Sequence, residues 1–319
     1  MDNSWRMSSL GLLLTMLAAC APPLPESNPS TTESVAGSAS PNLTYQNITL
    51  TESQPNGRIL WKVSAQQATY DNEGVSASLE TVAGEFYDPQ NRAITMLADR
   101  GSVYPLDKRL ELTGSVRVLS AHDQVEVQAD RVEWLPEENL LTATGQVILQ
   151  QNLQAEGSAS RWQLQSDRLT VNFADQQITL ANSSGEPVRG SVSQPNLQVA
   201  ATTVGFDLAQ QSLQAQGSVE IVDPEQQLNL QGDRMTSPWP PQQIVVTGNV
   251  VGRSDKSQLR VEAGQMTWQV GSTVVEAQGN VAYQQPNQNL SVRGSSATIN
   301  WQANTVAVRG GSTTQLNLP

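Results

Sequence analysis

The sequence is poor in the residues from which disulfides, metal centres and nucleophilic sites are built. Its 319 residues include one cysteine, Cys20, and one histidine, His122. A single cysteine cannot form a disulfide within the chain, and a Cys/His metal cluster needs several such ligands. His122 also has no serine or cysteine in register with it that could act as a nucleophile. We therefore expect no catalytic residue, no metal and no cofactor, and we interpret His122 as a loop residue.

Positive charge is also scarce. The chain has 18 lysines and arginines against 30 aspartates and glutamates, which gives a net charge of −12 and a pI of about 4.5. Binding to a phosphate backbone needs clustered Lys and Arg, so we expect no nucleic-acid partner. The phosphate-binding loop of nucleotide hydrolases is missing as well, so any energy that the protein uses must come from a partner.

Apolar runs long enough to span a membrane are missing. The run at residues 10–17 is shorter than the roughly 20 residues that a spanning helix needs. Arg6 precedes it and two alanines follow, which is typical of a secretory signal. Leu17-Ala18-Ala19-Cys20 resembles the bacterial lipoprotein box, in which the cysteine is lipidated. We therefore expect a lipoprotein signal peptide at 1–20, a lipid anchor at Cys20 and a disordered tether at 21–42. The alternative is an ordinary secretory signal with a chance cysteine.

What the sequence does contain is a cell of about 31 residues, repeated through most of the chain. One glycine in a recurring phrase marks it, at Gly114, Gly145, Gly217, Gly248, Gly279 and Gly310. The long interval from 145 to 217 fits two cells and about ten inserted residues, around Gly185-Glu186-Pro187. A fixed period in this range indicates a stack of like units that bury their apolar faces on one another.

Each cell has the pattern of two bent strands joined by a short turn. Val125, Val127 and Ala129 alternate with polar residues, and the alternation then skips one position and resumes at Val132. One extra residue is what a β-bulge or sheet corner requires, because the strand would otherwise turn its apolar side chains to the opposite face. We expect such bends near Asp130, Asp167 and Asp233, with the glycine of each return strand on the apolar face.

These patterns predict an all-β fold. About seven cells give about 14–16 antiparallel bent strands, and no segment after the signal shows the apolar period of a helix. Turns are expected at 88–91, 136–139, 174–177 and 270–272. The result is either two facing bent sheets or one coiled sheet.

Two kinds of side chain recur at fixed places in the cell. Aromatic residues precede most turns: Tyr104, Trp134, Phe173, Phe206, Trp239, Trp268 and Trp301. They are interpreted either as core packing at strand ends or as a ladder along the rim of a lipid-binding channel. Asp-Arg pairs recur at 99–100, 130–131, 167–168 and 233–234. The glycine-rich motif of calcium β-rolls is missing, so we expect these pairs to satisfy polar groups at the bulges and to form exposed ion pairs.

The order of these motifs resembles the periplasmic lipopolysaccharide-transport family, LptC joined to LptA/OstA-like repeats. Leu60 to Ala65, with Ala68 and Tyr70, resembles the opening strand of LptC, and Ala98 to Tyr104 resembles its next motif. The repeated Gly-x-Val resembles OstA-like modules. The resemblance implies an elongated twisted β-jellyroll, LptC-like at 43–181 and continued by an OstA/LptA-like jellyroll at 182–319. Proteobacterial LptC differs from this chain, since it is shorter and held by a transmembrane helix.

The resemblance also implies a function and partners. It implies a periplasmic protein, held by Cys20 with the inner membrane favoured, that takes lipopolysaccharide from an inner-membrane Lpt ABC transporter toward the outer membrane and so serves outer-membrane biogenesis. The first strands, at 43–65, would meet the transporter, and the last, at 297–318, would offer an edge to an LptA- or LptD-like partner. Lipid A acyl chains would lie on inward residues, for which we name Leu112, Val116, Val125, Val127, Leu141, Val147, Leu259, Val261, Val275 and Val281.

Two rival functions remain open at this point. A structural or adhesive surface lipoprotein would have the same strands around a dry, fully packed core. A parallel β-helix polysaccharide lyase would also repeat, but its catalytic cluster should interrupt the pattern in one cell, and the sequence shows no such cluster.

Overall fold

The structure, a computed structural model, describes residues 43–319 apart from 72–74, 123, 156–157, 255–257, 286–289, 312 and 317–319. The expected signal peptide, the lipid anchor at Cys20 and the tether therefore lie outside the described residues. Within the described part, regular structure consists of β-strands, and no helix there is long and apolar enough to cross a membrane.

Twenty strands form one antiparallel sheet. They are β1 (Leu43–Ser53), β2 (Ile59–Tyr70), β3 (Ala77–Tyr87), β4 (Ala93–Tyr104), β5 (Arg109–Ser120), β6 (Val125–Leu135), β7 (Leu140–Ala155), β8 (Ser158–Asn172), β9 (Gln177–Ala181), β10 (Val188–Val192), β11 (Leu197–Ala201), β12 (Thr203–Asp207), β13 (Ser212–Asp223), β14 (Leu228–Pro238), β15 (Gln243–Ser254), β16 (Leu259–Gln269), β17 (Val274–Gln285), β18 (Leu290–Asn300), β19 (Thr305–Arg309) and β20 (Thr313–Leu316).

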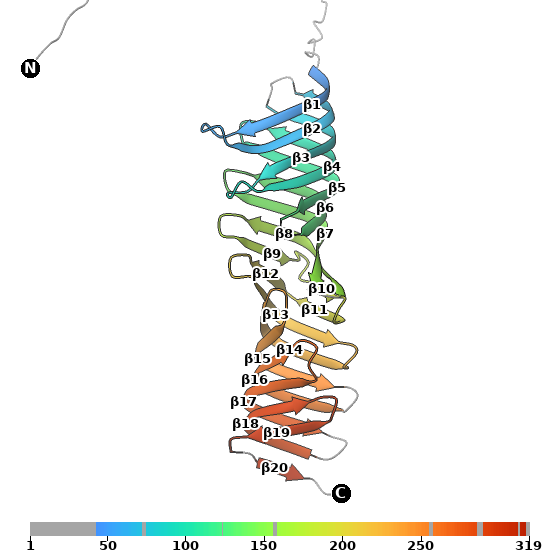
Figure 1. Ribbon diagram of the computed structural model, residues 1–319, viewed down its shortest axis with the longest axis vertical. Coiled ribbons are helices and arrows are strands. Elements are labelled where there is room, and N and C mark those ends of the chain that lie inside the picture. Colours follow the sequence, from blue (N-terminus) through green and yellow to red (C-terminus); the bar gives the residue numbers. More distant parts are fainter. Residues whose placement is uncertain are drawn as a thin grey trace, which may run out of the picture. The chain divides into compact units, whose positions relative to one another are not determined.

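The strands pair as a meander, mostly with the next strand along the chain. β1 pairs with β2, β2 with β3, and so on to β8, and the same order runs from β13 to β18 (Figure 1). In the described part of the chain, β1 pairs only with β2, while β19 and β20 pair only with β18. These three strands are therefore the edges of the sheet.

Three of the bent strands are split in two at the bend. β9 and β10 both pair with β8, β11 and β12 both pair with β13, and β19 and β20 both pair with β18. Counted as single bent strands, these pairs reduce twenty strands to seventeen, so the splitting accounts for most of the difference from the 14–16 expected. β9 pairs with β12, and β10 pairs with β11. The sheet is therefore uninterrupted at this place, although residues 182–187 are inserted between β9 and β10.

The bends lie where the skipped alternation predicts them. The pairing of β6 with β7 passes over two residues, Ala129 and Asp130, on β6 and three residues, Gly145, Gln146 and Val147, on β7, so β7 has one residue more at the bend. Equivalent shifts occur opposite Asp167 and Asp233. Both residues of the glycine pair have positive φ, 75° for Gly145 and 43° for Gln146, so this step is a two-residue left-handed bulge. The predicted bends are confirmed. The glycine does not lie on the apolar face as expected, because a Cβ on Gly145 would meet the exposed carboxylate of Asp130.

Bending brings the apolar faces of distant strands together in one core. Gly252 on β15 lies against the ring of Trp301, which follows β18, and against Met266 on β16. Buried hydrophobic side chains from β2 through Trp301 form a single cluster. The expected fold, an all-β jellyroll of bent antiparallel strands, is confirmed.

Candidate functional site

A cavity of about 360 Å³ opens into this core near the middle of the sheet. Its volume is in the range of small-molecule and lipid-chain pockets. The lining comes from strands that the bends bring together and from the turns between them: Arg92, His122, Val125, Leu149, Gln150, Gln151, Trp162, Gln176, Ile178, Phe206, Asp207, Leu208, Gln211, Ser212 and Trp239. We name it the seam cavity.

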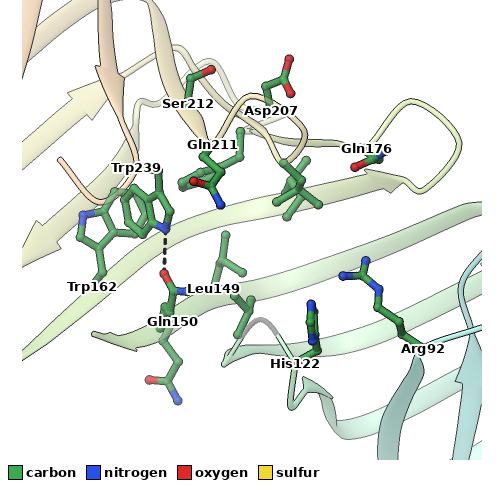
Figure 2. A pocket seen from close by; sticks show the side chains of 15 residues that line it. Arg92, His122, Leu149, Gln150, Trp162, Gln176, Asp207, Gln211, Ser212 and Trp239 are labelled. Atoms are coloured by element: carbon green, nitrogen blue, oxygen red, sulfur yellow. Dashed lines mark hydrogen bonds between the residues drawn. The ribbon is translucent and has the colours of Figure 1, made fainter. Parts of the chain in front are cut away.

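The two ends of the seam cavity differ in chemistry. Figure 2 shows Trp162 and Trp239 together at one end and Arg92 with His122 at the other, with Leu149 between them. Polar side chains, mostly amides, line the rest of the mouth. The cavity therefore offers an aromatic interior and a polar, partly basic opening.

A smaller cavity of about 70 Å³ adjoins the seam cavity and is almost wholly apolar. The two share Arg92, Val125, Leu149, Ile178 and Leu208. The remaining lining residues of the smaller cavity are Phe86, Ile94, Val118, Ser120, Val127, Leu141, Leu169, Val171 and Phe173.

Three aromatic rings close one end of the seam cavity, and we call them the first trio. Trp162 on β8 and Trp239 after β14 have ring centroids 4.4 Å apart, and each lies just over 5 Å from Phe206 on β12, all edge to face. The indole N–H of Trp239 donates to the Gln151 side-chain oxygen at 2.9 Å (Figure 2). The backbone N–H of Trp239 donates to the Gln211 carbonyl at 2.7 Å. These bonds fix the position of Trp239.

A second trio, Phe86, Trp134 and Phe173, lies at the smaller cavity. The ring of Phe86 on β3 is 4.8 Å from that of Trp134 on β6, and Phe173 lies 5.9 Å and 5.4 Å from them. Phe86 and Phe173 line the smaller cavity. Of the seven aromatic residues in the series, Phe173, Phe206 and Trp239 line a cavity, whereas Trp134, Trp268 and Trp301 pack in the core and line neither cavity.

The basic end is held by a buried carboxylate. Asp88 is fully buried, and its side chain accepts hydrogen bonds from the backbone N–H of Arg92 at 2.8 Å and from Arg92 Nε at 2.6 Å. Arg58 also donates to the Asp88 carbonyl. The guanidinium of Arg92 is thus positioned at the mouth by a carboxylate on the other side of its turn. His122 is exposed on the turn between β5 and β6.

The ten predicted groove residues all face the interior, but only some of them line a cavity. Nine are buried and belong to the core cluster, and Val125 is half-buried. Val125 lines both cavities, while Val127 and Leu141 line the smaller one. The other seven pack against neighbouring side chains in the core: Leu112, Val116, Val147, Leu259, Val261, Val275 and Val281.

The Asp-Arg pairs have a structural role at the bends. Asp99, Asp130 and Asp233 lie against the positive-φ glycine of the neighbouring strand. Arg131 pairs with Glu111 at 2.9 Å and is about half-exposed. Among the described residues, no three His, Cys, Asp or Glu side chains come together as metal ligands would.

Sequence reasoning missed the polar end of the site. His122 does lie in a turn, as expected, but it also lines the mouth of the seam cavity. Arg92 could not be predicted as a site residue, because no local sequence pattern connects it with the turn that contains His122, thirty residues further along the chain. A hint was available in the sequence, since both residues stand in turns between strands at the same end of their cells.

Comparison with known proteins gives one family match. Residues 10–126 match the family described as lipopolysaccharide-assembly, LptC-related. No curated protein matches the chain. Among solved structures, the chain is similar to LptH from Pseudomonas aeruginosa, described as the LptA homologous periplasmic component of the conserved lipopolysaccharide transport device. The identity is 13% and the TM-score 0.35, over 39% of this chain and 97% of that chain.

Proposed function

We propose that this chain, whose residues 10–126 match the LptC-related lipopolysaccharide-assembly family, is a periplasmic, non-enzymatic carrier of lipopolysaccharide acyl chains. The observation that carries the proposal is the seam cavity. Its opening is lined by polar side chains, and its apolar interior is bounded by aromatic rings. The family match makes lipopolysaccharide the first candidate for the molecule that the cavity holds.

The chemistry of the cavity suits an amphiphile. Each methylene that leaves water for an apolar interior gains about 0.8 kcal/mol, so even part of one acyl chain would bind appreciably. The polar part would stay at the mouth, near Arg92, His122 and the amides. Movement along the protein would be driven by the inner-membrane ABC transporter that the family resemblance implies.

The proposal extends to the anchor and the partners. Lipidated Cys20 would hold the protein at a membrane, with the inner membrane favoured, and 21–42 would be the tether. The edge strand β1 would meet the transporter, and β19 and β20 would pair with an LptA- or LptD-like partner by strand addition. We keep the division into an LptC-like part at 43–181 and an OstA/LptA-like part at 182–319 as part of this proposal.

A structural β-repeat lipoprotein remains the second candidate, because one observation favours it. Most of the interior is closed, and core residues such as Val261 and Val275 are fully buried. A protein with a purely structural role would need such a packed core and would need no cavity.

Site-specific photo-crosslinking in cells separates the two candidates. A photoreactive residue at Val127, on the smaller cavity, is expected to give lipopolysaccharide adducts, while one at Leu97, about half-exposed on the outer face, is not. A third placement at Val261, which lines neither cavity, tests whether lipid travels through the whole interior. If none of the interior placements gives a lipid adduct while the protein is folded and abundant, the carrier function is wrong and the structural one stands.

A further inference from the structure

We infer that the two aromatic trios set the length of the acyl chain that the seam cavity accepts. This inference rests on the proposed function, because it concerns the same cavity. The family match says nothing about chain length. The inference adds that the protein distinguishes straight-chain fatty-acyl groups by their number of methylenes.

A length-selective site needs a fixed origin, and the mouth supplies one. The polar end of a bound amphiphile must stay with water and polar side chains, because an unpaired polar group in an apolar interior is costly. Arg92 is positioned there by its two hydrogen bonds to buried Asp88. His122 and Gln176 lie toward the same end of the cavity, where the head of the chain has to remain (Figure 2).

A length-selective site also needs a stop, and the first trio supplies it. Trp162 and Phe206 are 3% and 6% exposed, and both are packed edge to face with Trp239. Trp239 is tied to Gln151 and Gln211 by its two N–H groups. Planar rings held on several sides do not yield to one more methylene as a flexible Met or Leu would, since interiors are close-packed and overpacking is costly.

The second trio bounds the other direction in the same way. Beyond the shared residues Val125, Leu149 and Ile178, the smaller cavity ends against Phe86 and Phe173, which are packed with Trp134. A chain that turns this way meets rings as well. The apolar run open to a single chain is therefore finite in both directions, although the core itself extends through the whole sheet.

The test uses purified full-length protein and a homologous series of saturated fatty acids, measured by displacement of a fluorescent fatty acid. Affinity is expected to rise about fourfold for each added methylene while the chain finds apolar room. At one chain length the rise should stop, and longer acids should bind no better or more weakly. Phe206→Ala removes one ring of the stop, so the chain length at which the rise ends should increase.

Two further variants keep the test decisive. Phe206→Leu is a milder change that should move the break in the same direction if the alanine variant does not fold. Ile299→Ala is the matched control, because Ile299 is fully buried in the core and lines neither cavity. It should leave the break where it is in the unchanged protein.

The outcomes separate this inference from the proposed function. If Phe206→Ala weakens all chain lengths equally, or if affinity rises without a break, length selection is wrong while acyl binding stands. Competition identifies the source of the chain. Displacement of the probe by lipopolysaccharide supports the proposed cargo, whereas displacement by phospholipid vesicles alone overturns lipopolysaccharide as the cargo and leaves length selection to be decided by the break. Failure of the unchanged protein to bind any acyl probe overturns both.

Discussion

At the scale of single residues, the repeat depends on a pair of left-handed residues that recurs in six of the return strands. The glycine of the pair has φ between 75° and 80° at Gly114, Gly145, Gly217, Gly248, Gly279 and Gly310. A side chain at Gly145 would place its Cβ 2.5 Å from Asp130 Oδ2, and 2.9 Å from Asp130 Cβ. Glycine is therefore required twice over, by its backbone angle and by the carboxylate beside it.

Replacement of this glycine should lower the free energy of unfolding by more than the strain of a left-handed backbone alone would. For Gly145→Ala we expect a loss of about 2–4 kcal/mol in the free energy of unfolding, about 1–2 from the backbone angle and the rest from displacement of Asp130. Urea titration followed by circular dichroism measures it.

Gly185→Ala provides the control for the backbone contribution. Gly185 has φ of 80°, but a Cβ there would meet nothing within 4 Å. Its loss should be limited to the backbone contribution. Equal losses at the two positions would show that the contact with Asp130 has no energetic role.

At the scale of elements, the inserted loop 182–187 is held to the bend of β8 by one carboxylate. Asp167 Oδ2 accepts hydrogen bonds from the Ser183 backbone N–H at 2.8 Å and from its hydroxyl at 2.5 Å. Asn182 accepts from the Asp167 N–H and donates to the carbonyls of Glu186 and Pro187. This loop fills the bend between β9 and β10, where the return strands β5, β7, β13, β15 and β17 have only a glycine pair.

This attachment should depend on pH. The hydrogen bonds from Ser183 lower the pKa of Asp167 below its ordinary value. The ionised carboxylate therefore stabilises the loop at any pH above the ordinary value near 3.9, and this stabilisation is lost as the pH falls through the lowered pKa. The measurement is the exchange protection of the Ser183 amide against pH, after correction for its intrinsic exchange rate.

Two substitutions show whether Asp167 is the group responsible. Asp167→Asn removes the charge, so protection at neutral pH should fall and its dependence on acid should disappear. Asp107→Asn, on an exposed turn, should change neither. Persistence of the acid dependence in Asp167→Asn would assign it to another group.

Strands, bends and turns could be predicted from the sequence because their signals are local. The skip after Ala129 is visible without knowledge of any partner strand, and the pairing across Asp130 follows it. The splitting of β9 from β10 and the cavities could not be predicted, because they depend on how two apolar faces pack across the core. Gln211, which has a positive φ at the end of its turn, carried no recognisable turn signal either.

At the scale of the whole molecule, strands pair mostly with their neighbours in the sequence. A destabilising substitution should therefore promote unfolding only in the strands near it. β16 pairs only with β15 and β17 among the described strands. Met266→Ala, at a fully buried position on β16, should cost about 2–5 kcal/mol. In a stack of units that contact mainly their neighbours, that loss should lower hydrogen-exchange protection in β14–β18 and leave β3–β6 protected.

The reciprocal variant is Leu112→Ala on β5, which is equally buried. It should lower protection in β3–β7 and leave β14–β18 nearly unchanged. A uniform fall in protection from either variant would mean that the sheet unfolds as one cooperative body.

The 31-residue cell also has an evolutionary consequence. Each cell contributes an outgoing strand, a return strand and its own bend, so its gain or loss would change the reach of the sheet by two strand spacings, about 10 Å, without disturbing the hydrogen bonds elsewhere. Gene duplication within such a chain would alter its length in whole steps. A lineage could therefore lengthen this protein by adding cells, whereas a globular fold would have to be redesigned to reach further.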